Sequence, residues 1–438
     1  MNNLKLSSIS TIIVISLILS LTVSVGPVQA ESKYIKLGSI EPLTGSLAAM
    51  GVSQQNAIDM AIKDINAAGG PLDKQIMLVR QDSQTKPAAG ASAAHKLIGV
   101  SGVPAIIGAC SSGVTIAISE VTIPNGTVQI STGSTSPRIT YLNDNGFVSR
   151  TAPPDIYCGG AMAMWAIDQG FETASTLVVN NPYGLGLSHA FADAFSAAGG
   201  EILNQVGILK NKSSYRTELR KAFSKDPDVV MNAAYAKDDI VTLKQWYELG
   251  YPNVWFEAPE GRTVGMIDAL GDIYNDFPVI DMHTPSTEFR EQFAKTYEET
   301  YDRRVGVWTR HAYDATMAIA LAVQEAGPEY LEGSRVEKAE MIRDHLRSVT
   351  NPPGEVVSYP DAFERGKKLL NEGKEINYEG ISGAVNFTET GDVVNDFMIW
   401  RVKDGEFVEE QKVPASDILD FLDKHGIMKE YEERWGEE

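Results

Sequence analysis

In Phe147-Val148-Ser149-Arg150-Thr151-Ala152-Pro153-Pro154, a short predicted strand runs directly into two prolines. Proline fixes its own backbone and restricts the residue before it, so this pair predicts a rigid connection between two parts of the chain. An alternation of strands and helices leads up to the stretch and starts again after it. Alternation of this kind predicts parallel sheets with helices on both faces. The sequence therefore predicts two α/β lobes, with the second inserted into the first.

The expected strands are short and rich in β-branched residues. Before the break they are Tyr34–Ile40, Gln75–Arg80, Ala105–Gly108 and Val128–Ser131, and after it Ser175–Asn180, Glu201–Ile208, Val229–Tyr235, Asn253–Glu257 and Phe277–His283. The expected helices include Val52–Ala67, Ala88–Gly99, Val114–Val121, Ile156–Gln169, Leu185–Ala198 and Ala312–Ala326. Near the end, Ala384–Phe387 and Asp396–Val402 are expected to pair as antiparallel strands, and Ala415–Glu438 is predicted to be helical.

Composition narrows the possible partners. The 438 residues include 38 Lys and Arg against 58 Asp and Glu, a formal charge of −20. A negative field of this size repels phosphate backbones and anionic lipid, so neither nucleic acid nor a membrane surface is an expected partner. The 2 cysteines are too few for a zinc cage or a disulfide framework. At roughly 100–200 residues per domain, the length predicts two or three domains.

The N-terminus has the pattern of an export signal. Lys5 precedes an apolar run from Ile9 to Val25, and the small residue Ala30 ends a cleavage pattern. Serines interrupt the run, which favours a cleaved leader over the alternative, a retained membrane anchor. We therefore expect residues 1–30 to be removed and the mature chain to be periplasmic or otherwise extracytoplasmic.

Polar residues gather where the predicted strands end. Cys110-Ser111-Ser112-Gly113 follows one strand and begins a helix, whose free N–H groups can hold an anion. Ser131–Pro137 places further hydroxyl groups around Gly133 after the next strand. In the second lobe Tyr183, Tyr235 and Glu260 follow strands in the same way. Ligands of such sheets bind beyond these strand ends, so two lobes predict a cleft. Taken singly, each motif also fits a helix cap or a solvated loop.

The sequence contains no assembled set of catalytic residues. Gly108-Ala109-Cys110-Ser111-Ser112-Gly113 lacks the glycine spacing of a nucleophile elbow, and Tyr183-Gly184-Leu185-Gly186 lacks the third glycine of a dinucleotide fingerprint. The 6 histidines show no metal-ligand spacing. We therefore expect a binding protein rather than an enzyme, with no metal and no cofactor.

In their order along the chain, these motifs resemble those of the type I substrate-binding proteins of ABC transporters, in the branched-chain amino-acid-binding group. The matching motifs are Glu41-Pro42-Leu43-Thr44-Gly45, the helix end Asp64–Gly70, Cys110-Ser111-Ser112, Ser131–Pro137, Tyr183-Gly184, Pro259-Glu260-Gly261 and Gly383 to Asp392. The resemblance implies the type I periplasmic binding protein fold, in which two doubly wound lobes are joined by three crossovers. These would lie near Thr151–Pro154, Met282–Pro285 and Phe387–Asp392. The N-terminal lobe would comprise residues 31–152 and 284–388, and the C-terminal lobe residues 153–283 and 389–438.

The resemblance also implies which residues contact a ligand. They are Met50, Ser111, Ser112, Gly133, Ser134, Thr135, Tyr183, Tyr235, Glu260 and Trp308. The serines, Gly133 and Thr135 would hold the head of an amino acid, the tyrosines would contact it when the lobes close, and Glu260 would neutralise its ammonium. Met50 and Trp308 would form the walls around the side chain; Met50 stands where relatives often have an aromatic residue.

The implied function is capture of an amino acid, branched-chain or otherwise apolar, and its delivery as a monomer to the permease of an ABC importer. The alternatives are a protein of the same fold for urea, short amides or aromatic acids, and a ligand-sensing receptor component. Gln84 replaces a cysteine that many members pair with the one at Cys110. Whether Cys110 bonds with Cys158 instead is left open by the sequence.

Overall fold

The computed structural model describes residues 33–252 and 254–435, so the predicted leader, residues 1–30, lies outside the described part of the chain. Within these two ranges no helix has the length and apolar character needed to cross a membrane. The described strands form two large sheets and one small pair.

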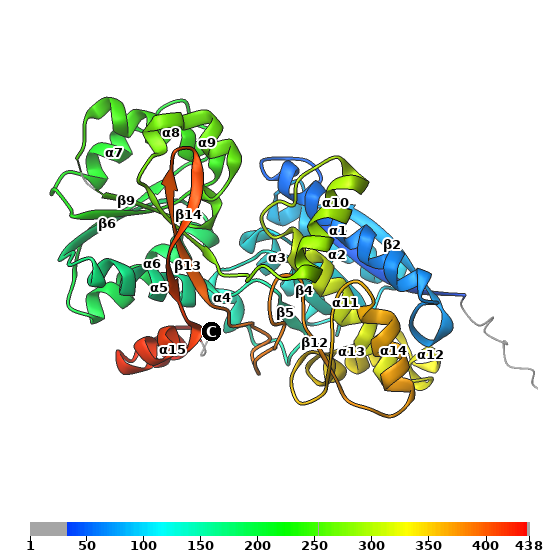
Figure 1. Ribbon diagram of the computed structural model, residues 1–438. Helices are drawn as coiled ribbons and strands as arrows, with labels where there is room; N and C mark the ends of the chain where they lie inside the picture. Colours follow the sequence, from blue (N-terminus) through cyan, green and yellow to red (C-terminus); the bar gives the residue numbers. More distant parts are fainter. Residues whose placement is uncertain (1–32, 253, 436–438) are drawn as a thin grey trace, which may run out of the picture. The chain divides into compact units, whose positions relative to one another are not determined.

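The first sheet consists of parallel strands in the order β2-β1-β3-β4-β5. Figure 1 labels β2, β4 and β5 of this sheet. These are β1 (Tyr34–Glu41), β2 (Gln75–Asp82), β3 (Ala105–Gly108), β4 (Val128–Ser131) and β5 (Val148–Arg150). Successive side chains of a strand point to opposite faces. Ile35 and Leu37 therefore pack with helices α1 (Ala48–Ala67) and α11 (Thr309–Ala326), whereas Ile40 packs with α2 (Pro87–Lys96) and α3 (Ser112–Thr122). Both faces are covered, as the continuous apolar strands predict.

The second sheet has the order β14-β13-β10-β9-β8-β6-β7. Its strands are β6 (Thr173–Val179), β7 (Glu201–Ile208), β8 (Val229–Ala233), β9 (Val254–Glu257), β10 (Pro278–Met282), β13 (Phe397–Lys403) and β14 (Glu406–Val413). Helix α5 (Asp155–Asp168) precedes β6, and the α-helices between successive strands from β6 to β10 are α6 (Pro182–Ala197), α7 (Arg216–Ala222), α8 (Ala236–Leu249) and α9 (Val264–Leu270). Pairs among β6 to β10 are parallel, whereas β13 runs antiparallel to β10.

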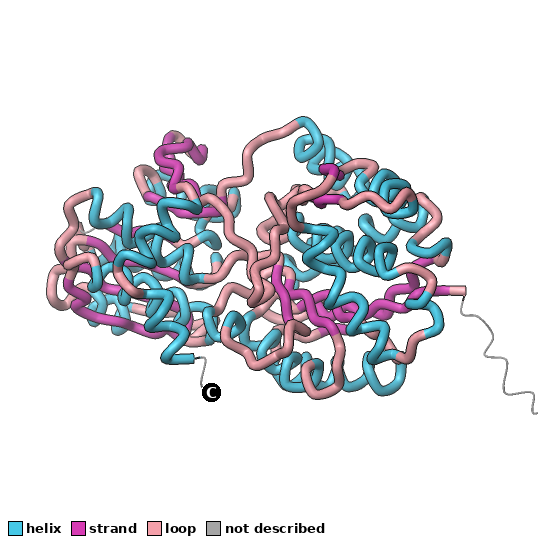
Figure 2. Tube along the Cα trace, turned by 90° about the horizontal axis from the view of Figure 1, so that it is seen from below, coloured by secondary structure: helices cyan, strands magenta, loops and turns pink. Residues whose placement is uncertain are grey.

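The chain passes between the two sheets more than once. It leaves the first sheet after β5, returns after β10, and reaches the second sheet again at β13. Helices α10 (Glu288–Tyr301), α11, α13 (Arg335–Thr350) and α14 (Ala362–Asn371) belong to the core of the first sheet although they follow β10. Figure 2 shows loops where the chain makes these passages. We refer to each sheet with its helices as the first and the second lobe; the residue boundaries given above remain a prediction.

The pairing expected near the C-terminus is wrong. β13 pairs with β14, whereas Ala384 forms only an isolated bridge with Glu379. Asp404 and Gly405 link β13 to β14 with positive φ values of 50° and 78°, a turn whose twist suits a two-residue hairpin. Most of β14 is exposed and polar at the sheet edge, so it lacks the apolar run that marks the other strands.

Two further segments complete the C-terminal third. Strands β11 (Glu355–Val357) and β12 (Ile376–Tyr378) form a small parallel pair that the sequence does not predict. The segment predicted as helical from Ala415 divides into α15 (Ala415–Lys424) and α16 (Ile427–Trp435). Gly426 lies between them with φ 71°, which interrupts a right-handed helix.

A buried ion pair fastens the first passage to the third. Arg150, the last residue of β5, donates from Nε to Asp392 Oδ1 at 2.6 Å, and both side chains are almost fully buried. Its Nη1 donates to the carbonyl oxygens of Ser134 and Ser136 at 3.2 and 2.8 Å. One guanidinium therefore holds two passages and the loop after β4 in a common arrangement.

We predict that Arg150→Ala lowers the free energy of unfolding by about 3–5 kcal/mol, because it leaves Asp392 as an uncompensated buried charge. Urea denaturation measures this directly. The control is Arg216→Ala, which removes an exposed ion pair with Glu248 and is expected to cost at most about 1 kcal/mol. Equal small losses in both variants would show that Arg150 does not hold the passages together.

Candidate functional site

A small cavity is lined by residues of both lobes. Its volume is about 10 Å³, room for about one water molecule. The lining residues are Leu47, Met50, Cys110, Ser111, Ser112, Gly133, Tyr183, Tyr235, Glu260 and Trp308. Apart from Ser134 and Thr135, every residue assigned to the ligand by resemblance is therefore found at one place. That these residues contact a ligand is taken up below as a proposal.

Two lining residues were missed by the sequence analysis. Cys110 ends the strand-to-helix connection and directly precedes Ser111, so its position in the motif was a usable signal. Leu47 precedes the first residue of α1 and has an apolar side chain, so no polar motif marks it.

The first lobe contributes a helix N-terminus to the cavity. Ser111 is the N-cap of α3 and Ser112 is its first residue, and the Ser111 side chain makes no capping hydrogen bond. The first backbone N–H groups of a helix lack partners within it and attract anions. Ser112 Oγ accepts a hydrogen bond from the backbone N–H of Ser136 at 3.3 Å, which joins this turn to the loop after β4. This part of the cavity can therefore hold a negatively charged group.

Trp308 packs across the backbone of Gly133. A Cβ atom at Gly133 would lie 3.0 Å from Trp308 Cγ and 3.3 Å from Cys110 Sγ, so only glycine allows this approach without displacement. Trp308 itself has a φ of 63° and precedes α11. Cys110 Sγ in turn donates to Met50 Sδ at 3.1 Å. An indole ring and two sulfur-containing side chains thus form an adaptable wall.

Ser134 and Thr135 do not line the cavity. The Ser134 hydroxyl shares a hydrogen bond with Thr115 Oγ1 at 2.7 Å and donates to the carbonyl oxygen of Ala109 at 3.0 Å. The Thr135 carbonyl oxygen accepts from the N–H of Asp155 at 2.7 Å. In this structure both residues hold the loop after β4 in place, and their role as ligand contacts stays a prediction.

The second lobe contributes two tyrosines and a carboxyl group. The Tyr183 hydroxyl donates to Glu260 Oε2, and the Tyr183 and Tyr235 rings stack with their centroids 6.0 Å apart. Asn181 Nδ2 donates to the Tyr235 hydroxyl at 3.0 Å, which fixes the second ring. Glu260 is 7% exposed and has no Lys, Arg or His within ion-pair distance among the described residues. Its carboxyl group is therefore buried with a phenol as its side-chain partner.

Burial controls the charge of Glu260. Loss of solvation raises its pKa to about 7, although the hydrogen bond from Tyr183 acts in the opposite direction. Glu41, at the end of β1, is also buried, and its pKa is raised to about 8 in spite of a hydrogen bond from Thr132 Oγ1 at 2.7 Å. One Glu41 carboxyl oxygen has no partner. Both acids would be more stable as carboxylates if a cation were present.

The two cysteines are free and buried, which answers the question that the sequence left open. Burial is the main cause that raises the pKa of each thiol well above its usual range, so both are neutral. Cys110 therefore contributes contact surface to the cavity rather than a thiolate.

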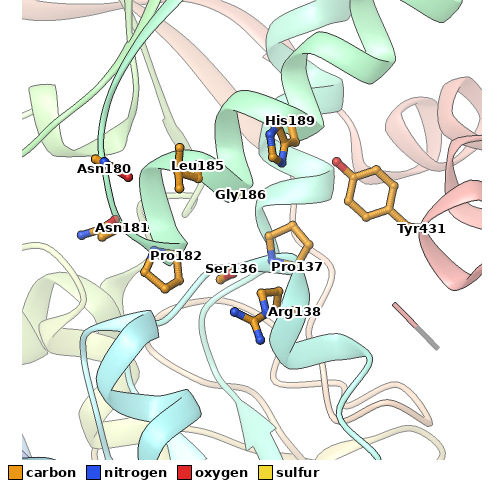
Figure 3. A pocket seen from close by; sticks show the side chains of 10 residues that line it. All are labelled: Ser136, Pro137, Arg138, Asn180, Asn181, Pro182, Leu185, Gly186, His189 and Tyr431. Carbon is orange, nitrogen blue, oxygen red and sulfur yellow. The ribbon is translucent and has the colours of Figure 1, made fainter. Parts of the chain in front are cut away.

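A larger cavity of about 380 Å³ lies beside the first passage (Figure 3). Pro137 and Arg138 of the first lobe face Leu185 and His189 of α6 across it, and the Tyr431 side chain comes from α16. None of the residues assigned to the ligand by the sequence lines this cavity. Volume alone therefore does not single out the cavity where the predicted ligand residues lie together.

Comparison with known proteins identifies the family. A family model described as periplasmic binding protein matches residues 34–406 of the 438. The chain belongs to the periplasmic binding protein family. The family consists of solute-binding proteins, and the predicted type I fold is confirmed by the solved structures that this chain resembles.

The relatives of this periplasmic binding protein carry several functions in their names. A Leu/Ile/Val-binding protein BraC3 of Rhizobium johnstonii is 29% identical over 85% of this chain and 93% of its own length. A chemotactic signal transduction substrate-binding protein, BasB of Halobacterium salinarum, is 25% identical over 84% and 87%. A leucine-binding protein LivK structure from Thermotoga maritima has a TM-score of 0.72 at 23% identity, covering 87% of this chain and 99% of that one. A benzoate complex of an R. palustris solute-binding protein has a TM-score of 0.72 at 17% identity, covering 87% and 97%.

We predict that Glu260→Gln stabilises the ligand-free protein at pH 8. The carboxyl pKa is raised from 4.5 to about 7 on folding, so its stabilising contribution is present below pH 4.5 and is lost as pH rises through 7. At pH 8 the neutral amide should therefore add about 2–3 kcal/mol to the free energy of unfolding. The difference between variant and parent should shrink toward pH 5. Glu120→Gln on the exposed face of α3 is the control, with no expected change. A destabilised Glu260→Gln variant at pH 8 would contradict the assigned charge state.

Proposed function

We propose that this protein captures an amino acid outside the cytoplasmic membrane and delivers it to an ABC importer. The observation that carries the proposal is Glu260, a buried carboxyl with no cation within ion-pair distance among the described residues, in the same cavity as the N-terminus of α3. An α-amino acid supplies one cation and one anion, and it can leave water only where both charges find partners.

The two lobes offer complementary partners for the head of an amino acid. The carboxylate would accept hydrogen bonds at Ser111 and Ser112, where helix dipole and free N–H groups favour an anion. The ammonium would pair with Glu260 and take the place of the Tyr183 hydroxyl. Because Ser111 lies in the first lobe and Glu260 in the second, one ligand would bridge the lobes and stabilise their closed arrangement.

The side chain of the ligand would meet an apolar wall. Leu47, Met50 and Trp308 line the cavity, and their side chains carry no charge. Charged amino acids would be left without partners there, so branched-chain or other apolar amino acids are the proposed ligands. A cavity of about 10 Å³ cannot admit any of them, so the lobes must separate for entry.

A second candidate function, binding of an aromatic acid, has support from the benzoate complex of the R. palustris protein. A protein of the same fold is described in complex with benzoate, a ligand with a carboxylate and no ammonium. Such a ligand would not need Glu260. BasB is named as part of a chemotactic signal transduction system, which suggests a sensing role as a further alternative. The partner would then be a receptor rather than a permease. The chemistry of Glu260 favours the amino acid over the aromatic acid. We further propose that the leader is cleaved and that the mature protein acts as a monomer and catalyses no reaction.

Binding of the amino acid should depend on the ionisation of Glu260. The empty site has a pKa of about 7 there, and an ammonium favours the carboxylate, so a proton is released on binding below neutrality. Between pH 7 and pH 5 the association constant is expected to fall by up to about tenfold per pH unit. Calorimetry in buffers of different ionisation enthalpy measures the released proton.

Two variants test whether the pH dependence of binding arises from Glu260 or from another buried acid. Glu260→Ala should weaken binding at pH 8 by about 2–5 kcal/mol and remove the pH dependence. Glu41→Gln should retain most of it, because Glu41 does not line the cavity. Unchanged affinity in Glu260→Ala would favour a ligand without an ammonium group.

Selectivity among amino acids should reside at Met50 and Trp308. Trp308→Ala is expected to shift the rank order toward bulkier side chains by about 1–3 kcal/mol per added methylene, with the free amino and carboxyl groups still required. Thermal-shift ranking of the twenty amino acids reports the order. Leu185→Ala, in the cavity beside the first passage, is the matched control. The same rank order in the Trp308 variant and the parent would remove Trp308 from the selectivity wall.

A further inference from the structure

A third cavity, of about 390 Å³, adjoins the small one and shares Trp308 with it. It lies where the chain leaves β10 and where α11 begins. Arg290, Arg310 and His311 of the first lobe line it, together with Arg262 and Trp400 of the second. Its volume is in the range of sites for small molecules, roughly 300–1,000 Å³. None of the family motifs identified in the sequence accounts for it.

The three arginines of this cavity differ in their partners. Arg262 pairs with Asp281 Oδ2 at 2.9 Å and stacks on the Trp400 ring, 3.7 Å from its centroid. Arg290 pairs with Glu379 at 2.6 Å. Arg310 forms no ion pair and no hydrogen bond with any described residue. Burial lowers its pKa, whereas the negative charge of Asp281, which lies beyond ion-pair distance, acts in the opposite direction. A partly desolvated cation that touches no carboxylate is costly, so an anion in direct contact with Arg310 would be favourable.

Hydrogen-bond donors without acceptors gather around the same space. The Nε–H groups of Arg262, Arg290 and Arg310 are buried without partners, and so is the indole N–H of Trp400. His311 Nδ1 is also buried without a partner, and in the neutral ring it can donate or accept according to the tautomer. Such an excess of unpaired donors is unusual, because buried polar groups in folded proteins are nearly always paired.

The acidic residues of the cavity do not use these donors. Asp281 is already paired with Arg262, and Glu291 and Glu409 are exposed side chains at its rim. Asp281 is only 16% exposed, but both of its carboxyl oxygens already accept hydrogen bonds, one from Arg262 and one from the backbone N–H of Met282. The remaining unpaired donors suit an oxyanion with several acceptor oxygens.

We propose that this cavity binds a small oxyanion, a carboxylate, sulfate or phosphate group, between Arg310 of the first lobe and Arg262 of the second. The guanidinium of Arg310 supplies the unpaired charge, and the buried N–H groups supply directed hydrogen bonds. If the proposed preference for apolar amino acids holds, the oxyanion is a free ion; its alternative source, the distal acid of a ligand that extends past Trp308, would overturn that preference. Because both lobes contribute, its binding stabilises the arrangement in which the lobes are together, and Trp308 connects it with the small cavity.

Sulfate is the first probe, titrated into the full mature chain without amino acid at constant ionic strength set by sodium chloride. We expect a saturable rise in melting temperature, and Arg310→Gln to weaken it at least tenfold. Arg310→Lys, which keeps the charge and loses the fork geometry, should retain part of it. Arg304→Gln, six positions earlier and exposed, is the control and should match the parent. Absence of a saturable effect in the parent, or equal binding by Arg310→Gln, would overturn the proposal.

A second comparison distinguishes the two sources of the oxyanion. A free ion is indicated if sulfate tightens the binding of an apolar amino acid and the amino acid tightens the binding of sulfate. Both increases in affinity should then disappear in Arg310→Gln. If amino acids with a distal carboxylate compete with sulfate and lose their advantage over apolar analogues in Arg310→Gln, the ligand carries it. Glu260→Gln should leave the sulfate response intact, so failure of the proposed amino-acid function and failure of this site give different results.

Discussion

Keeping the Glu260 carboxyl away from water is the constraint that connects the fold of this protein with its proposed ligand. A carboxyl at this depth must stay protonated, find a cation, or lower the stability of the folded chain. The second lobe provides a phenol, no Lys, Arg or His of the described residues lies within ion-pair distance, and burial raises the pKa of Glu260 to about 7. Near neutral pH the Glu260 carboxyl is therefore partly protonated, and a cation in the cavity would favour the carboxylate. The proposed function of this cavity rests on a buried charge that the fold itself does not compensate.

The remaining architecture serves to bring that carboxyl opposite a partner for anions. Parallel strands place their carboxyl ends on one edge of each sheet, and the loops there present Ser111 and Glu260 to the same space. The Arg150–Asp392 pair holds the passages between the sheets, and Arg150 also fixes the loop after β4 through two carbonyl oxygens. The buried Arg150–Asp392 pair thus helps to hold the structure in which the Glu260 carboxyl lacks a cation.

Much of this could be predicted from sequence, for physical reasons. Buried parallel strands are continuous apolar runs, so the alternation from Tyr34 to Glu257 was visible, and the polar residues after strands marked the site. Strand β14 was not predicted because it is an exposed, polar edge strand and lacks the apolar run of the other strands. The Asp404-Gly405 turn connects it to β13. Leu47 was not predicted as a lining residue because its role depends on apolar contact rather than on charge, whereas Cys110 could have been predicted from its place beside Ser111. The inward orientation of Ser134, the raised pKa of Glu260 and the unpaired Arg310 all depend on tertiary burial, which periodicity does not encode.

The most direct test of the account compares two ligands that differ only in the ammonium group. Leucine and 4-methylpentanoic acid share the carboxylate and the side chain, and calorimetry at pH 8 measures both on the parent protein and on Glu260→Gln. We predict that the parent prefers leucine by a free energy of about 2–5 kcal/mol, the scale expected for a buried charge pair. The preference should largely disappear in Glu260→Gln. Equal affinity of the parent for the two compounds, or a preference that survives in Glu260→Gln, would contradict the claim that Glu260 selects an ammonium.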